Sequence, residues 1–165
     1  MIKFIIDEEG LMNDPKVPDW IKENPQILIP ERKTQHSAGY DIKLPYDLTI
    51  RNSNNVLGVA LAETYIKIEM DPKYVAYMFI RSSVGVKKYT VLANGTGVID
   101  ADYKDTIKLP LKLYAPIDEK YSAGEPVAQI VFHQYFITDE DKDKIKNNVD
   151  DKPVRTGGIG STNKK

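Results

Sequence analysis

The chain has 165 residues, which is about the size of one domain. It contains no Cys, which excludes disulfides and Cys-ligated metal sites, and its two His residues, His36 and His133, are far apart in the sequence. With 23 Lys and Arg against 24 Asp and Glu, the net charge of −1 argues against bulk binding of nucleic acids. No apolar run reaches the ~18–20 residues of a membrane span, and residues 1–7 turn acidic too early for a secretory signal. We expect a cytoplasmic, single-domain protein without a membrane partner.

The first part of the chain changes from an irregular composition to an alternating one. Residues 8–26 are rich in Pro, Asp and Glu, with Trp20 as the one large anchor, and we expect a loop or insertion there. Apolar and polar residues then alternate along 42–50, 66–70 and 107–113. This alternation predicts strands that are buried on one face.

The remaining runs complete a β-rich pattern. Residues 75–80 are continuously apolar, which is typical of a strand covered on both faces, and 127–137 hold another strand or a pair. Residues 139–148 have Ile145 as their only apolar side chain, so we expect a short helix at most. Turn residues separate the runs, and the predicted fold class is all-β: a sandwich, jelly roll or barrel. The charged, Gly-rich stretch 150–165 cannot pack into a core and should be mobile.

Five short segments carry the residue types of a binding site, although each also has an ordinary structural interpretation. Asp41 follows a tight glycine turn at the start of a strand, where an ordinary turn Asp would also stand. After the continuous apolar strand, Arg81, Ser82, Ser83 and Gly85 can present several donors to a phosphate chain. The same residues could simply cap a turn.

The stretch 94–103 is the most informative of the five. Asn94 and the glycines near it suit a hairpin, and the Asn amide offers both a donor and an acceptor, which matches the edge of a pyrimidine base. Asp100 lies between an apolar and a small residue, a suitable place for a positioned base, and Tyr103 brings an aromatic face close to the same turn. A hairpin without a site remains an alternative.

The last two segments lie nearer the C-terminus. Gln129 is the one polar side chain in an apolar stretch and needs a partner, which can be the backbone or a ligand. In the tail, Arg155 and the pair Ser161–Thr162 flank three glycines. Such a segment can wrap a polyphosphate closely or serve as a linker.

Taken together and in this order, the five segments resemble the motifs of the trimeric deoxyuridine triphosphate nucleotidohydrolases (dUTPases), a family with phage and bacterial members. The match spans residues 37–162. The resemblance implies a jelly roll of residues 1–151, a mobile tail of residues 152–165 that closes over the active site, and a homotrimer with active sites shared between subunits. It also implies hydrolysis of dUTP to dUMP and pyrophosphate with Mg²⁺ as the cofactor, which limits uracil in DNA and supplies dUMP for thymidylate synthesis.

The resemblance also assigns roles to single residues. Asp41 helps hold the magnesium ion through water, Asp100 activates the water that attacks the α-phosphorus, and Tyr103 packs on the deoxyribose. The remaining substrate-binding residues are Arg81, Ser82, Ser83 and Gln129 for the phosphates, Asn94 with the backbone of Gly97, Val98, Ile99 and Asp100 for uracil, and Arg155, Gly158, Ile159, Gly160, Ser161 and Thr162 in the closing tail, together with Gly85 and Lys108.

The sequence departs from the usual motifs of the family in three places. One residue rather than two separates Arg155 from Gly157, which places the reach of the arginine in doubt. Ile159 stands where the family usually has a Phe that stacks on uracil, and Asp105 replaces a common Gly.

Two alternative functions remain open from the sequence. The dCTP deaminases share the fold and related motifs, but the place of their catalytic Glu is taken here by Pro110, which cannot do acid–base chemistry. A dUTP-responsive regulatory or binding protein of the same fold would have a protein partner, for which residues 8–26 and 139–151 are candidate surfaces.

Overall fold

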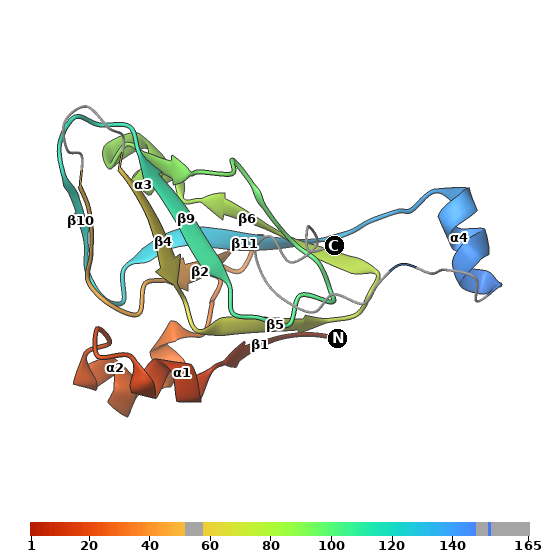
Figure 1. Cartoon of the computed structure of the whole chain (residues 1–165), viewed down its shortest axis with the longest axis horizontal. Helices are drawn as coiled ribbons and strands as arrows, with labels where there is room; N and C mark the ends of the chain where they lie inside the picture. Colours follow the sequence, from red (N-terminus) through yellow and green to blue (C-terminus); the bar gives the residue numbers. More distant parts are fainter. Residues whose placement is uncertain (52–57, 148–151, 153–165) are drawn as a thin grey trace.

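The computed structural model describes residues 1–51, 58–147 and 152, and within them it confirms the all-β prediction. Four antiparallel sheets enclose one hydrophobic core, and their strand orders are β2-β11-β6-β8, β4-β9-β7, β1-β5 and β10-β3. In Figure 1, β4 and β9 cross in front of β6 and β11, so that the two larger sheets form layers of a jelly roll.

The strands and helices follow one another in this order: β1 (Ile2–Ile6), α1 (Glu8–Asn13), α2 (Asp19–Glu23), the 3-10 helix η1 (Pro25–Leu28), β2 (Tyr40–Lys43), β3 (Leu48–Ile50), β4 (Val59–Glu63), β5 (Ile66–Met70), β6 (Tyr74–Ile80), α3 (Ser82–Lys87), β7 (Thr90–Leu92), β8 (Gly97–Ile99), β9 (Lys108–Leu113), β10 (Glu119–Tyr121), β11 (Pro126–Gln134) and α4 (Asp139–Lys146). Within the described residues, no helix is long and apolar enough to cross a membrane.

The alternating segments form strands as predicted because their period of two places every apolar side chain on one face. In β9, Leu109, Leu111 and Leu113 are fully buried while the residues between them are only partly buried. In β5, Ile66 and Ile68 are buried in the same way. The burial of these residues against the opposite layer fixes the register of both strands.

The prediction of one strand over 42–50 is wrong, because the chain turns in the middle of this run. β2 ends at Lys43 and pairs with β11, whereas β3 begins at Leu48 and pairs with β10. Pro45 stands between them and has no N–H with which to continue a ladder. The predicted run 127–137 is a single strand, β11, that ends at Gln134.

The prediction that residues 75–80 are covered on both faces holds in the single chain only near the start of β6, where Val75 and Ala76 are both buried. Ala76 and Met78 are buried on the face of β6 toward the core. On the other face, Tyr77 is half-buried and Phe79 is 38% exposed, and their rings contact each other at 6.4 Å between centroids. The outer face of this sheet therefore presents aromatic side chains to solvent.

The prediction of a loop over residues 8–26 is wrong, since this segment forms α1, α2 and the start of η1. Leu11 and Ile21 are fully buried in the main core and anchor the two helices. Trp20, the anchor expected from the sequence, is 47% exposed, and the end of its ring lies against Gly124. The helical segment packs below β1 and β5 in Figure 1.

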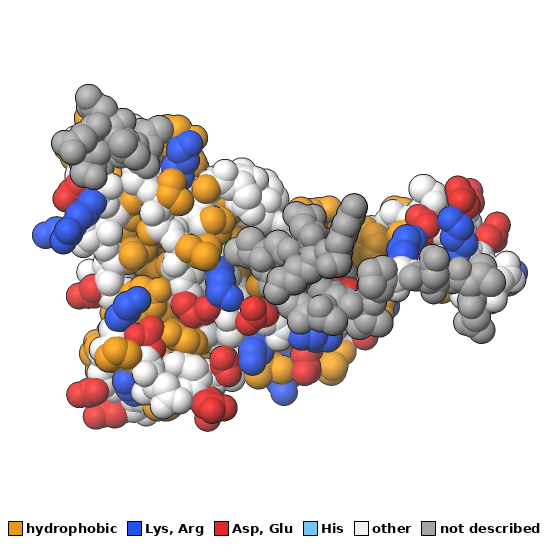
Figure 2. Space-filling model, viewed as in Figure 1, with side chains coloured by type: hydrophobic (Ala, Val, Ile, Leu, Met, Phe, Trp, Pro, Cys, Tyr) orange, Lys and Arg blue, Asp and Glu red, His pale blue; other side chains and the backbone are white. Residues whose placement is uncertain are grey.

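The short helix expected near residue 139 is confirmed as α4. The Thr138 side chain caps its N-terminus by accepting a hydrogen bond from the backbone N–H of Asp141 at 3.2 Å, and no residue of the helix is buried. Figure 1 shows α4 standing off from the body beyond the end of β11, and Figure 2 shows charged side chains of both signs on it. The predicted mobile tail lies outside the described residues except for Lys152, which pairs with Asp141 at 2.6 Å.

Candidate functional site

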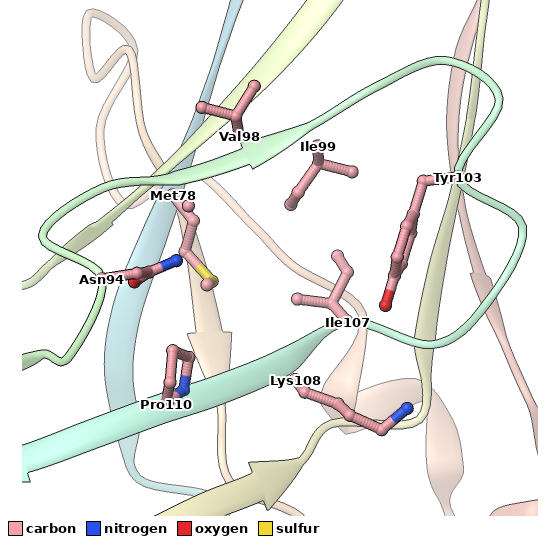
Figure 3. A pocket seen from close by; sticks show the side chains of 9 residues that line it. Met78, Asn94, Val98, Ile99, Tyr103, Ile107, Lys108 and Pro110 are labelled. Carbon is pink, nitrogen blue, oxygen red and sulfur yellow. The ribbon is translucent and has the colours of Figure 1, made fainter. Parts of the chain in front are cut away.

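The stretch that the sequence singled out as most informative lines a pocket between β8 and β9. In Figure 3, Asn94 and Tyr103 stand on opposite sides of this pocket, with Ile99 and Ile107 between them and Lys108 reaching in from β9. The described residues that line it are Met78, Asn94, Gly97, Val98, Ile99, Tyr103, Ile107, Lys108 and Pro110. The structure thus brings together most of the residues predicted for uracil and the sugar, namely Asn94, Gly97, Val98, Ile99 and Tyr103, with Lys108 beside them.

The predicted hairpin at this place is wrong, although its turn is present. β7 pairs with β9 and β8 pairs with β6, so the chain between them crosses from one sheet to the other. Gly95 has a φ of +73°, a left-handed conformation that glycine adopts without strain. Because the crossing opens a gap between the two sheets, the turn residues lie at a pocket instead of the tip of a ribbon.

Asp100 and Tyr103 occupy a tight turn directly after β8. The backbone N–H of Tyr103 donates to the backbone carbonyl of Asp100 at 3.1 Å, and the Asp100 side chain is exposed. The Tyr103 ring is buried, and its hydroxyl donates to the carbonyl of Thr106 at 3.0 Å. The loop thereby fixes the ring as a wall of the pocket and holds the Asp100 backbone next to the lining residue Ile99.

Lys108 is held between two carboxylates. Its Nζ lies 3.3 Å from Asp105 Oδ2 and 3.6 Å from Glu63 Oε2. Burial alone would lower the pKa of Lys108, but the charges of Glu63 and Asp105 outweigh it and raise that pKa above its usual value. Sequence reasoning missed Glu63, whose partner lies 45 positions away and on another strand.

A second group of predicted residues meets where β2, β6 and β11 run side by side. Gln129 of β11 is directly opposite Asp41 of β2, and Arg81 follows β6 with its Nε 3.2 Å from Asp41 Oδ1. Asp41 Oδ2 is buried and has no hydrogen-bond partner. Gln129 fits because Gly39 has no side chain: a Cβ there would lie 2.3 Å from Gln129 Oε1. We call Asp41, Arg81 and Gln129 the polar cluster.

The two serines of the predicted phosphate-binding segment open the short helix α3 next to this cluster. Ser82 and Ser83 are both exposed in its first turn. Two further hydrogen bonds hold Arg81 in place. Its backbone N–H donates to the carbonyl of Val127, and its side-chain Nη1 donates to the carbonyl of Pro126, both at 3.1 Å. The serine hydroxyls and the guanidinium are therefore grouped at one end of the sheet.

The donor set for a magnesium ion is small in this chain. Among the described residues, no three His, Asp or Glu side chains lie together as a protein cage for a metal would require. Among the described residues, Asp41 Oδ2 is the one buried side-chain nitrogen or oxygen atom without a hydrogen-bond partner. This set fits an ion that keeps its waters and takes other ligands from phosphate oxygens, as Mg²⁺ does in many phosphate sites.

The pocket and the polar cluster are separate parts of the molecule. No described residue that lines the pocket belongs to the cluster. The pocket has a volume of about 100 Å³, whereas small-molecule sites usually have ~300–1,000 Å³. The described residues of one chain therefore enclose only part of a nucleotide-sized site. The predicted tail residues, Arg155, Gly158, Ile159, Gly160, Ser161 and Thr162, lie outside the described residues.

Comparison with known proteins places these features in one family. The dUTPase family model matches residues 26–163. The deoxyuridine 5'-triphosphate nucleotidohydrolase of Lactococcus lactis is 34% identical over 146 residues, which cover 85% of this chain and 91% of that protein. The crystal structure of the dUTPase of Streptococcus mutans matches with a TM-score of 0.63 and 34% identity, covering 69% of this chain and 91% of the other.

A phage protein shares the fold at lower identity. The dUTPase of phage phi11 of S. aureus has a TM-score of 0.64 at 18% identity, over 84% of this chain and 94% of that chain. The family model covers most of the sequence and includes both the pocket residues and the polar cluster. The chain therefore belongs to the dUTPase family.

Proposed function

We propose that this protein hydrolyses dUTP to dUMP and pyrophosphate, and so limits uracil in DNA and supplies dUMP for thymidylate synthesis. The observation that carries the proposal is the convergence of Asn94, Ile99, Tyr103 and Lys108 on one pocket, with Asp100 next in the chain to Ile99. A pyrophosphate-release assay with dUTP, dCTP, dTTP and UTP tests it. We expect turnover of dUTP alone, and equal turnover of dCTP or UTP would contradict the proposal.

The pocket has the chemistry to select a deoxyuridine nucleotide. The Asn94 amide and the backbone of residues 97–99 offer donors and acceptors that match a pyrimidine edge. The Tyr103 ring is buried at the pocket wall, where it would pack on the deoxyribose and disfavour a 2′-hydroxyl. Pro110 also lines this pocket, and since it carries no ionisable group, it argues against the deamination of dCTP.

The reaction needs a water, a base and a held triphosphate. Asp100 takes a proton as the water oxygen bonds to the α-phosphorus, and the bond from that phosphorus to the bridging oxygen breaks with pyrophosphate as the leaving group. Arg81, Ser82 and Ser83 bind the phosphates, with Gln129 beside them. Asp41 would hold a magnesium ion through water, and that ion would neutralise charge on the phosphate oxygens.

We expect the protein to be a homotrimer whose active sites combine the pocket of one chain with the polar cluster of another. Large apolar side chains are exposed on two sheets, at Val59 and Leu61 of β4 and at Phe79 and Val98 of the other layer. Figure 2 shows hydrophobic side chains gathered over β4 and β9. Light scattering at micromolar concentration should return three times the mass of the chain, and a monomer mass would contradict the assembly.

We further expect the C-terminal tail to be dispensable for folding and required for turnover. The proposed phosphate contacts of Arg155, Gly158, Gly160, Ser161 and Thr162, and the place of Ile159 over the base, would come from a neighbouring subunit. A chain that ends at Lys152 should keep the melting temperature of the full chain, because the missing residues carry almost no apolar area. Its dUTP turnover should fall by at least tenfold. Unchanged turnover would mean that the tail is only a linker.

We also propose that the protein acts in the cytoplasm and has a regulatory protein partner. The N-terminal helices expose Met12, Trp20 and Ile27, and most of this segment precedes the part of the chain that the family model matches. Exposed large apolar side chains favour contact with another protein. Co-purification of a partner with the full chain, and its loss when Trp20 is replaced by Ser, would support that role.

A further inference from the structure

Lys108 owes its position to residues that no part of the proposed mechanism uses. The side chain of Lys108 extends from the central strand β9 and lines the pocket. Its Nζ lies between the carboxylates of Glu63 and Asp105. Both Glu63 and Lys108 are half-buried, with 22% and 27% of their side chains exposed. A half-buried ion pair is screened less by solvent than one on the open surface, so Glu63 can restrain the lysine.

Glu63 is itself held in one orientation. Its Oε1 accepts the backbone N–H groups of Thr64 at 2.9 Å and of Tyr65 at 3.2 Å. The backbone N–H of Glu63 donates to the hydroxyl of Tyr46 at 2.9 Å. Because one carboxylate oxygen is engaged by the turn, the other oxygen, Oε2, faces Lys108.

The turn that orients Glu63 depends on an unusual backbone at Tyr65. Tyr65 has a φ of +59°, which non-glycine residues seldom adopt unless their surroundings impose it. The N-terminal segment supplies those surroundings. Tyr65 Oη donates to Asp14 Oδ2 at 2.6 Å, its carbonyl accepts from the N–H of Asp7 at 2.8 Å, and its ring lies against Gly10. Burial and the bond to Asp14 raise the pKa of Tyr65, so the phenol stays a donor.

We propose that Glu63 is a positioning residue for Lys108 in the nucleotide pocket, and that residues 7–14 fix Glu63 through Tyr65. The inference rests on the proposed function, in which Lys108 binds dUTP. Residues 7–14 precede the match to the family model, which begins at residue 26. The proposal thus assigns this segment a part in substrate binding although it lies outside the pocket lining.

A simple charge effect predicts the opposite of this proposal. If Glu63 were only a negative charge near the site, its removal would weaken repulsion of the anionic substrate and lower KM. If Glu63 positions Lys108, the Glu63→Gln variant loses the restraint and KM rises. The Gln side chain keeps a carbonyl oxygen for the N–H groups of Thr64 and Tyr65, so the turn should fold as before.

The test measures steady-state kinetics with dUTP. We expect Glu63→Gln to raise KM about fivefold while kcat stays within about twofold of the wild type. The matched control is Glu119→Gln, since Glu119 pairs with Lys88 at 3.2 Å, with 18% and 27% of the two side chains exposed, and neither residue lines the pocket. The control should leave KM unchanged.

A double-mutant cycle decides whether Glu63 acts through the lysine. In a Lys108→Met background, Glu63→Gln should cause no further rise in KM, because there is no ammonium left to position. A KM that Glu63→Gln leaves unchanged or lowers, or that rises equally in the Lys108→Met background, would overturn the proposal. A wild type that does not hydrolyse dUTP would instead contradict the proposed function, and this inference with it.

The Tyr65→Phe variant tests the role of the N-terminal segment. It removes only the hydroxyl that donates a hydrogen bond to Asp14. We expect KM to rise about twofold with kcat unchanged. Added to Glu63→Gln, Tyr65→Phe should cause no rise beyond the fivefold effect of Glu63→Gln alone. Tyr46→Phe, which removes the other phenol next to Glu63, serves for comparison because it leaves the Asp14 contact intact. A Tyr65→Phe variant with the KM of the wild type would remove residues 7–14 from the inference.

Discussion

The Asp100→Asn variant is expected to bind dUTP normally and to lose at least about two orders of magnitude in kcat. The amide has the shape of the carboxylate but cannot accept a proton from water. The turn should survive the change, because the bond from Tyr103 is made to the backbone carbonyl of Asp100 and not to its side chain. Steady-state kinetics and calorimetric titration with dUTP measure the two effects.

Asp102 provides the matched control for that variant. It is exposed in the same turn, two positions further on, so Asp102→Asn removes the same charge from nearly the same place. We expect its kcat to stay within about twofold of the wild type. If Asp100→Asn kept more than about a tenth of the wild-type kcat, Asp100 could not be the base.

The Arg81→Ala variant is expected to lower kcat/KM about 100-fold, because a charge-assisted hydrogen bond to phosphate contributes ~1.5–3 kcal/mol. It should also lower the melting temperature. Asp41 already has one buried oxygen without a partner, and the change removes the guanidinium from the other. An unpaired charge in a buried place destabilises the folded state.

The two effects of Arg81→Ala can be separated by a second substitution. Adding Asp41→Asn removes the unpaired charge, so the melting temperature should recover while kcat/KM stays low. Arg81→Lys should lie between the wild type and Arg81→Ala, since lysine keeps the charge but not the planar fork of donors. A value of kcat/KM for Arg81→Ala within about fivefold of the wild type would exclude a phosphate contact.

The sequence predicted those elements whose pattern depends on burial alone. The alternation in 66–70 and 107–113 is visible because every second residue faces the core. The helices of residues 8–26 were missed because their buried residues, Leu11 and Ile21, are isolated among Pro, Asp and Glu, which suggested a loop. Only tertiary packing against the core makes these short helices stable.

The site was predicted as a set of residues but not as a geometry. Turn chemistry at Asn94 and Gly95 predicted a turn correctly, but it does not say which strand each arm joins, and the expected hairpin proved to be a crossing between sheets. The ion pair of Glu63 with Lys108 could not be predicted, because the two residues are distant in the sequence. The left-handed backbone at Tyr65 was equally hidden, since it requires contacts with residues 7–14.

The division of the site residues between pocket and polar cluster has a consequence for gene dosage. In a trimer of the proposed kind, each active site takes its pocket from one subunit and its cluster from a neighbour. A subunit with a damaged pocket then inactivates one active site. A subunit in which both the pocket and the polar cluster are damaged inactivates two of the three active sites. An inactive allele that still assembles would be partly dominant over the wild-type gene, whereas an allele whose product fails to fold would be recessive.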